Sequence, residues 1–137
     1  MKRSPLQRRS PLRARPRNHR RARVSRYQRR ERNVRYMLFV KTLDCRALVT
    51  IPGHRCFGPT ESDHAGRRGT GQKADDTTCI PLCQQAHRHR HDFAGPFRSW
   101  SQARMRRWLE EAIVATQLSA IAAGVWAGPA LALEAAG

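Results

Sequence analysis

The sequence predicts a small α+β domain with short extended segments in its centre, flanking helices and a basic N-terminal arm. Three observations lead to this fold class. Apolar residues near 34–38 fall at helical spacing, short apolar runs with β-branched residues lie near 48–51 and 77–82, and a second helical pattern follows residue 99. A chain of 137 residues is at most one domain. We divide it into an arm (1–25), a folded domain (26–112) and an Ala-rich tail (113–137).

The positive charge is concentrated in the arm. The chain carries 27 Lys and Arg against 10 Asp and Glu, a formal net charge of +17. Residues 1–36 hold 15 of these basic residues and one acid, so they account for +14. A basic arm on a nearly balanced body indicates a polyanionic partner, nucleic acid before an anionic membrane. A merely solubilising tail is the alternative.

The arm begins with a repeat, SPLQRR at 4–9 followed by SPLRAR at 10–15. Its prolines forbid a continuous helix and its apolar content is too low for a core, so the arm is expected to be disordered when free. The prolines also disfavour the amphipathic transit peptide that an Arg-rich N-terminus resembles. No signal peptide is visible. The residues expected to contact phosphates are Arg8, Arg9, Arg13 and Arg15.

Two elements are expected before residue 63. Val34, Met37 and Leu38 predict the buried stripe of a helix over roughly residues 27–42. The run from Leu48 to Ile51, with Pro-Gly and Gly-Pro turn signals after it, predicts a short hairpin or ribbon that leads into Asp63.

The four cysteines indicate a metal site or simple burial, because no secretory signal accompanies them. A structural zinc held by some of them is one hypothesis, although neither pair has the two-residue spacing of a zinc knuckle. Burial of a small apolar side chain in the strand-like TCIPLC is the other. The candidate ligands are Cys45, Cys56, Cys79 and Cys83.

Residues 63–91 carry most of the chemistry. Asp63 and His64 are adjacent, so on an extended segment one side chain can hold a cation while the other faces a substrate water. Residues 77–82 read as a strand, and QQAHRHRH after it as a helix with His87 and His91 at i and i+4. A divalent cation on Asp63, His87 and His91 would leave positions open for phosphate and water. His89 would point elsewhere.

The loop between these segments is suited to a phosphate backbone. Glycines at 66, 69 and 71 keep it open to close approach. Basic side chains within it are expected to contact phosphate, namely Arg67, Arg68 and Lys73.

Together, DHAG, GQKADDTTCIPLC and the following H-x-x-x-H resemble the HNH, or ββα-metal, endonucleases, most closely small phage and prophage members. The likeness covers about residues 36–98 and, loosely, the basic repeat at 1–15. It implies that His64 is the general base and that Asp63, His87 and His91 bind the metal. The middle Asn of the family motif is absent, and Asp76, Thr77 or Thr78 occupies that region.

The resemblance implies a metal-dependent DNA endonuclease that uses one divalent metal (Mg, Mn or Zn), with a structural Zn as a further possibility. It also implies phage or prophage origin, action in the cytoplasm of a bacterial host cell, and a possible recombination or packaging partner. Two alternatives stay open: a zinc-stabilised DNA-binding module without catalysis, and an accessory recombination protein that cuts only partner-coated substrate.

The C-terminal third predicts one helix and a tail. Ser99 with Gln102 forms a capping-box pattern, and a buried stripe is expected at Met105, Trp108, Leu109 and Ala112. Residues 113–133 are apolar over about the length of a membrane span, but they are mostly Ala and Gly and are interrupted by Gly124, Gly128 and Pro129. A frayed helix with a disordered end is expected, and no membrane partner; a membrane anchor is the alternative.

Overall fold

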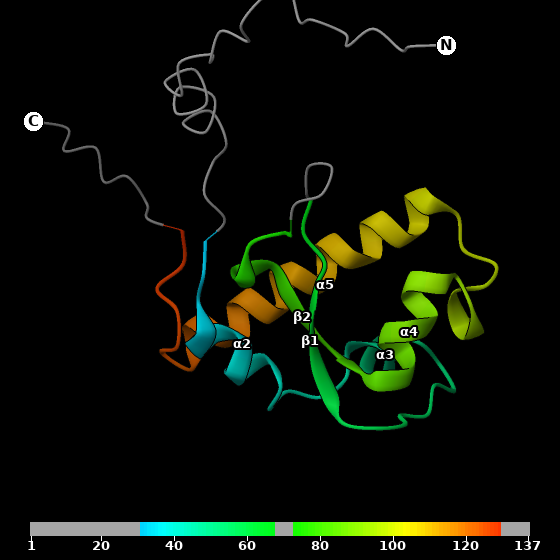
Figure 1. Ribbon diagram of the computed structural model, residues 1–137, viewed down its shortest axis with the longest axis horizontal. Helices are drawn as coiled ribbons and strands as arrows, with labels where there is room; N and C mark the ends of the chain where they lie inside the picture. Colours follow the sequence, from blue (N-terminus) through cyan, green and yellow to red (C-terminus); the bar gives the residue numbers. More distant parts are fainter. Residues whose placement is uncertain (1–30, 68–72, 130–137) are drawn as a thin grey trace, which may run out of the picture.

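The computed structural model describes residues 31–67 and 73–129, and it confirms the α+β class. One two-stranded antiparallel sheet lies among helices (Figure 1). Figure 1 shows the long helix α5 running behind this sheet, with α2 toward one end and α4 toward the other. The helices and strands are α2 (Val34–Val40), α3 (Arg46–Thr50), β1 (Thr60–His64), β2 (Cys79–Cys83), α4 (Gln84–Asp92) and α5 (Gln102–Ala122).

The hairpin and the helix after it form a ββα unit. β1 pairs with β2 so that Asp63 faces Ile80 and Thr60 faces Cys83. All five residues of β2 are buried, which explains why CIPLC reads as a continuous apolar run without alternation. α4 starts directly after β2, because the Cys83 side chain caps it by accepting a hydrogen bond from the Ala86 N–H.

Helix α5 joins two apolar clusters. Its first half packs Met105, Trp108 and Leu109 against β2, α3 and α4, and its second half buries Ala120 beside Tyr36. The expected stripe at Met105, Trp108, Leu109 and Ala112 is buried as predicted. Trp108 also donates a hydrogen bond from Nε1 to the Thr50 hydroxyl on α3 (2.9 Å), so the polar edge of the ring is satisfied.

Both ends of α5 differ from the sequence-based expectation. The N-cap is Ser101, whose hydroxyl accepts from the Arg104 N–H, whereas Ser99 lies before the helix. The helix does not fray after residue 112. It continues to Ala122 with Thr116 and Ala120 buried, so the boundary drawn at residue 112 falls inside it.

The buried face of α2 is also different from the predicted one. Of the predicted stripe, Val34 and Leu38 are exposed and Met37 is partly buried against the core, whereas Tyr36 and Val40 are fully buried at i and i+4. Packing against α5 and the sheet decides the face, since Tyr36 makes an edge contact with Trp126 beyond the end of α5. A short helix offers apolar residues on both sides here, so spacing alone could not choose between them.

The run from Leu48 to Ile51 is not a strand. Its first three residues lie in α3 and Ile51 is the C-cap of that short helix, which buries Ala47 and leaves Leu48 and Val49 exposed. The partner of β1 is therefore β2, fifteen or more residues later in the chain, and not this segment. β-branched composition is a weak guide where a segment is short and tertiary packing can override it.

The predicted disordered arm and the end of the predicted tail fall outside the residues that the structure describes. The arm at 1–25, together with the first part of the helix expected from residue 27, lies outside the described residues, as does the end of the tail from residue 130. Within the described ranges, no helix combines the length and the apolar character that a membrane crossing requires.

A pair of truncations on α2 tests the corrected face. Val40→Ala is expected to lower the free energy of unfolding by about 1–2 kcal/mol, because it opens a cavity at a fully buried site. Leu38→Ala, at a residue 59% exposed, should change it by no more than about 0.5 kcal/mol. Urea unfolding measures both, and equal losses would contradict the assignment.

Candidate active site and metal-binding clusters

Strand β1 sends Asp63 and His64 to opposite faces. The Asp63 side chain is 2% exposed, while that of His64 is partly exposed. An extended backbone alternates its side chains, so two adjacent residues serve two different environments. This agrees with the expectation drawn from the D-H pair.

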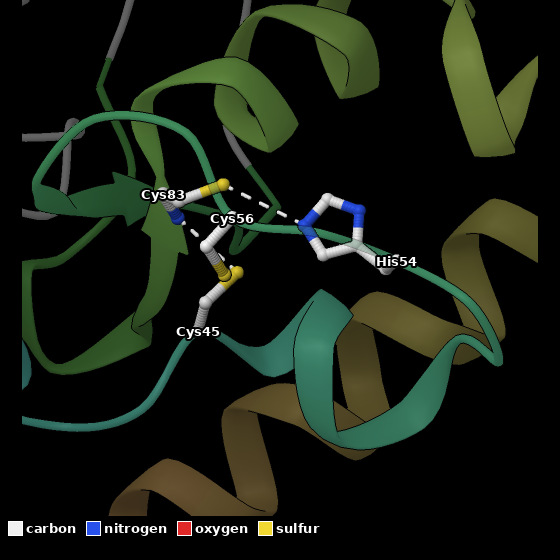
Figure 2. Close-up of side chains that lie close together, drawn as sticks. All are labelled: Cys45, His54, Cys56 and Cys83. Carbon is white, nitrogen blue, oxygen red and sulfur yellow. Dashed lines mark hydrogen bonds between the residues drawn. The ribbon is translucent and has the colours of Figure 1, made fainter.

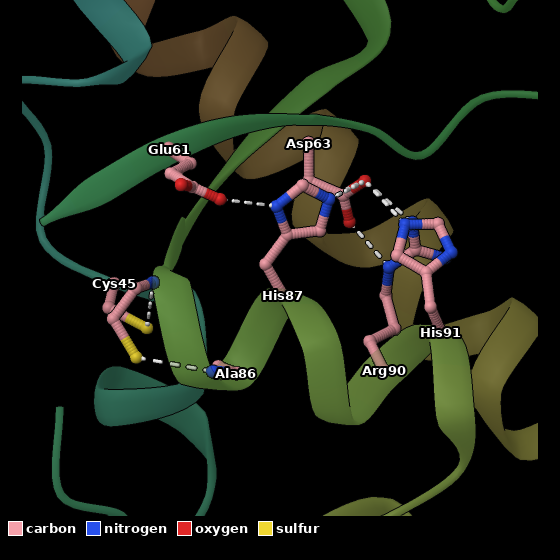
Figure 3. A network of polar contacts seen from close by, with 8 residues as sticks. Cys45, Glu61, Asp63, Ala86, His87, Arg90 and His91 are labelled. Carbon is pink, nitrogen blue, oxygen red and sulfur yellow. Dashed lines mark hydrogen bonds and ion pairs between the residues drawn. The ribbon is translucent and has the colours of Figure 1, made fainter. Parts of the chain in front are cut away.

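Asp63, His87 and His91 converge as predicted and form the first cluster able to hold a metal ion, with one ligand atom from each within 4.8 Å of the others. Asp63 Oδ1 lies 3.3 Å from His87 Nε2 and 3.7 Å from His91 Nε2. Both histidines come from one face of α4, and their ring centroids are 5.1 Å apart. Figure 3 shows both rings turned toward the Asp63 carboxylate.

Glu61, two residues before Asp63 on β1, fixes the orientation of the His87 ring. Its Oε2 accepts a hydrogen bond from His87 Nδ1 at 2.6 Å (Figure 3). The other ring nitrogen, Nε2, therefore faces Asp63. A histidine that donates one N–H to a carboxylate and turns its second nitrogen to a cation is a common arrangement in metal sites.

The protonation of this cluster matches a site that exchanges protons for a cation. The hydrogen bond to Asp63 raises the pKa of His87, against the effect of burial, and Glu61 adds to the rise. Burial alone would favour neutral Asp63, but the hydrogen bonds from His87 and Arg90 outweigh it and lower the pKa of Asp63. A cation would replace the His87 proton opposite an already ionised carboxylate.

Arg90, also on α4, grips the same carboxylate. Its Nη2 donates to Asp63 Oδ1 at 2.6 Å, and its Nε pairs with Oδ2. Nη2 also donates to His91 Nε2 at 3.0 Å, so this histidine nitrogen is unprotonated and its lone pair is directed at Arg90. The buried charge of Asp63 is thereby compensated by a guanidinium that also contacts one of the candidate metal ligands.

His64 on the other face is held by Asp76. Its Nε2 lies 2.9 Å from Asp76 Oδ1, and this carboxylate is 2% exposed. An ionised carboxylate only accepts hydrogen bonds, so His64 donates from Nε2 and the neutral ring carries its lone pair on Nδ1. Asp76, one of the residues in the region of the absent Asn, thus holds the His64 ring.

The loop that carries Asp76 is bound to the segment where the basic arm meets the body. Asp76 Oδ2 accepts from the Asn33 N–H at 2.9 Å, and Asp75 Oδ1 accepts from the Glu31 N–H at 2.7 Å. The Asp76 N–H donates in turn to the Glu31 carbonyl oxygen. The residues that lead out of the arm therefore help to position the partner of His64.

Gly66 has a packing role beside this site. A Cβ on Gly66 would lie 2.4 Å from the Thr78 hydroxyl oxygen, closer than any real contact. The loop after His64 therefore approaches the 76–78 turn closely only because residue 66 has no side chain. From the sequence we predict that Gly66 keeps the loop open to phosphate. The structure gives Gly66 this packing role in addition.

His64 lines a pocket of about 420 Å³ between the loop after β1 and the helices α4 and α5. Three arginines line it with His64, namely Arg67, Arg90 and Arg106. Arg67, predicted to contact phosphate, lies here and pairs with Glu110 at 3.3 Å, both side chains being well exposed. The lining is therefore strongly basic.

Of the remaining residues predicted to contact phosphate, Lys73 alone lies within the described part of the chain. Lys73 is exposed at the edge of the loop. The other predicted contacts lie outside the described residues, namely Arg8, Arg9, Arg13, Arg15 and Arg68.

A second cluster able to hold a metal ion such as zinc lies at the other end of β2. Its ligand atoms lie within 4.8 Å of one another, and they belong to Cys45, His54, Cys56 and Cys83. Figure 2 shows the three sulfurs and the imidazole turned toward a common centre. Three cysteines and a histidine match a closed tetrahedral zinc site.

The structure corrects one predicted member of this set. Cys79 is not in it; it is fully buried beside Tyr36 and Val40. Cys79 and Cys83 occupy opposite ends of one strand, and four residues of strand span about 13 Å. His54 takes the fourth place, and the H-x-C spacing of His54 and Cys56 after a Pro-Gly turn is the signal that could have identified it.

The chemistry of this cluster fits a thiophilic cation. Burial favours the Cys83 thiol, but the backbone N–H groups of Ala86 and Phe57 and bonds with the other two cysteines outweigh it and lower the pKa of Cys83. Burial and the neighbouring sulfurs raise the pKa of Cys56 to about 12. Burial and nearby His89 lower the pKa of His54, which keeps its imidazole neutral. All three cysteines can be thiolates together only around a cation.

Several residues of the first site could not be predicted from the sequence. Glu61, Arg90 and Arg106 carry no motif signal, because their roles depend on which strand pairs with which and on where α5 crosses α4. His89, by contrast, turns away from the cation site as expected and lines a different pocket with His54. Comparison with protein-family models, with curated proteins and with solved structures found no match to this chain.

Two cysteine variants test the second cluster. We expect Cys83→Ala to bind one zinc fewer per chain than wild type and to melt at a lower temperature, because a ligand shared by α4 and β2 is lost. Cys79→Ala should keep the wild-type zinc content, since its sulfur lies in the other apolar cluster. Elemental analysis after dialysis measures this, and identical zinc content in both variants would count against the site.

Proposed function

We propose that this chain is a metal-dependent DNA endonuclease of the HNH type. One observation carries the proposal. A single ββα unit brings Asp63, His87 and His91 close enough to bind one cation. The side chain of the adjacent His64, held by Asp76, lines a pocket that three arginines also line. This is the division of roles that the motif resemblance implies for these same residues.

The residues present fit a divalent metal. A buried carboxylate oxygen and two imidazole nitrogens converge, and Glu61 holds one of these rings in the ligand orientation. Such a set of one oxygen and two nitrogens suits Mn or Zn and is compatible with Mg. When bound, the metal would polarise the scissile phosphate and stabilise charge on the leaving 3′ oxygen.

His64 is the proposed general base. Its Nδ1 would accept a proton from water while Asp76 holds the Nε2 proton and stabilises the imidazolium that forms. The water oxygen bonds to phosphorus and the bond from phosphorus to the 3′ oxygen breaks. The leaving 3′ oxygen takes a proton from solvent, so the products are a 5′ phosphate and a 3′ hydroxyl. A positioned base of this kind contributes about 10²–10⁴ in rate.

The proposed substrate is DNA, contacted mainly through its backbone. The 15 basic residues of positions 1–36 neutralise phosphates without reading bases, so cutting should depend weakly on sequence and strongly on salt. Phage or prophage origin, action in the bacterial cytoplasm and a recombination or packaging partner belong to this proposal as well.

The Cys45, His54, Cys56 and Cys83 cluster also favours a second function, a zinc-stabilised DNA-binding module without catalysis. That module would need the cysteines but not His64. The third possibility is an accessory recombination protein that cuts only partner-coated DNA. Such a protein would need both the cysteines and His64.

Nicking of supercoiled plasmid with Mg²⁺, Mn²⁺ or Zn²⁺ tests the proposal. Wild type is expected to nick with at least one metal and to stop on chelation. His64→Ala should lose about 10²–10⁴ in rate yet keep its affinity for DNA, which comes from Lys and Arg. Failure of wild type to nick while both proteins bind DNA would leave the binding module or a partner-dependent enzyme.

Two neighbouring aspartates separate positioning of His64 from general loop stability. Asp76→Ala should lower kcat by about 10²-fold or more with little change in KM, since His64 loses its orienting partner. Asp75→Ala is the control, because Asp75 bonds the Glu31 N–H but not His64. Steady-state cleavage of a labelled oligonucleotide checks this, and equal losses of kcat in the two variants would refute the assigned role.

A further inference from the structure

Two pockets adjoin across a shared wall formed by α4 and α5. The first, of about 420 Å³, contains His64. The second, of about 500 Å³, contains His91 at the edge of the cation cluster. Both are lined by Arg90, Arg106 and Leu109. The proposed base and one proposed metal ligand therefore lie on either side of a wall that carries two guanidinium groups.

Arg106 is the less expected of the two. It lies on α5, in the part of the chain beyond the motif, and its side chain is half-buried. Among the residues that the structure describes, no carboxylate forms an ion pair with it, whereas Arg67 pairs with Glu110 and Arg90 with Asp63. A partly buried guanidinium beside a pocket, with no carboxylate paired to it, favours an anionic ligand.

We propose that Arg106 and Arg90 form the seat of the scissile phosphodiester, between His64 and the cation cluster. The inference rests on the proposed function for the identity of its ligand. A guanidinium presents two parallel N–H donors that match two phosphate oxygens, and it keeps its charge at any working pH. Here the donors come from two helices, so the phosphate would be held from α4 and α5 at once.

Arg90 links this seat to the metal ligands. Its Nη2 now binds Asp63 Oδ1, the oxygen that also faces His87 and His91, while its Nε pairs with Oδ2. A cation held by Asp63 Oδ1 and His91 Nε2 would compete with Nη2 for both of its present acceptors, and the Nε contact could persist. Nη2 would then be available to the phosphate in the adjoining pocket.

The rival explanation is that the arginines are purely structural. It accounts for Arg90, whose fork compensates a buried carboxylate, and for this reason Arg90 variants cannot decide the question. It does not account for Arg106, which has no such carboxylate among the described residues. Arg106 therefore carries the test, and Arg107 is the matched control, because it is the next residue on α5, exposed, and lines neither pocket.

The experiment measures binding of a thymidine dinucleotide, which has a single phosphodiester, to the Mn²⁺-loaded full chain by calorimetry. All proteins carry His64→Ala to prevent turnover, and the variants compared are Arg106→Gln, Arg106→Lys and Arg107→Gln. We expect Arg106→Gln to weaken binding about 10- to 100-fold, the usual effect of a lost charge-assisted hydrogen bond. Arg106→Lys should recover part of this, since it restores charge without the fork. Arg107→Gln should stay within about twofold of the parent.

Plasmid nicking by the same substitutions in the wild-type background separates the seat from the function. Nicking that is lost in Arg106→Gln but kept in Arg107→Gln would support both. Nicking by wild type with equal dinucleotide binding by Arg106→Gln and Arg107→Gln would overturn the seat and leave the nuclease. Arg106-dependent dinucleotide binding without any nicking would support the seat and overturn the nuclease. No dinucleotide binding by the parent would overturn the seat outright.

Discussion

The buried carboxylate of Asp63 is the constraint on which the site depends. At 2% exposure an isolated carboxylate would be strongly disfavoured, so the fold must supply positive charge or hydrogen-bond donors to it. α4 supplies them from two positions, His87 and Arg90, and places His91 beside them. These positions face β1 because α4 begins at the residue that ends β2, with Cys83 as its cap. Strand pairing, helix start and charge compensation are thus parts of one arrangement.

That arrangement also shows how two adjacent residues could take the two proposed roles, metal ligand and general base. The alternation of β1 directs Asp63 to the cation cluster and His64 to the pocket, without any loop having to separate them. Asp76 holds the His64 ring from a turn. Hydrogen bonds with Glu31 and Asn33, close to the arm, keep that turn in place. The orientation of His64, the proposed base, therefore depends on contacts on both sides of the hairpin. Gln117 on α5 adds one more, donating to the Thr77 carbonyl oxygen.

The second cluster lies where a bound metal would stabilise so small a domain. It joins the N-cap of α3, the loop at residues 54–56 and the junction of β2 with α4. A domain with one short hairpin and few long helices has a limited core, and a bound metal commonly makes up the difference. Cys83 is both a ligand candidate here and the cap of α4, so metal binding at this end would help to fix the helix that bears His87 and His91 at the other.

Local patterns predicted those parts of the molecule that local chemistry determines. The D-H pair, the strand predicted at 77–82 and found at 79–83, and the i, i+4 histidines follow from short-range spacing, and the structure brings Asp63, His87 and His91 together as expected. The face of α2, the helical state of residues 46–50 and the exchange of Cys79 for His54 follow from tertiary packing, which spacing does not encode. Glu61 and Arg106 became visible only once the register of the hairpin and the path of α5 were known.

The most direct test of the account is the position of a Mn²⁺ ion in crystals of the full chain, located by its anomalous scattering. We predict a peak within bonding distance of Asp63 Oδ1, His87 Nε2 and His91 Nε2, with Glu61 still bonded to His87 Nδ1. A crystal that shows no peak there at saturating Mn²⁺, with both Arg90 contacts to Asp63 retained, would contradict the claim that these residues form a metal site.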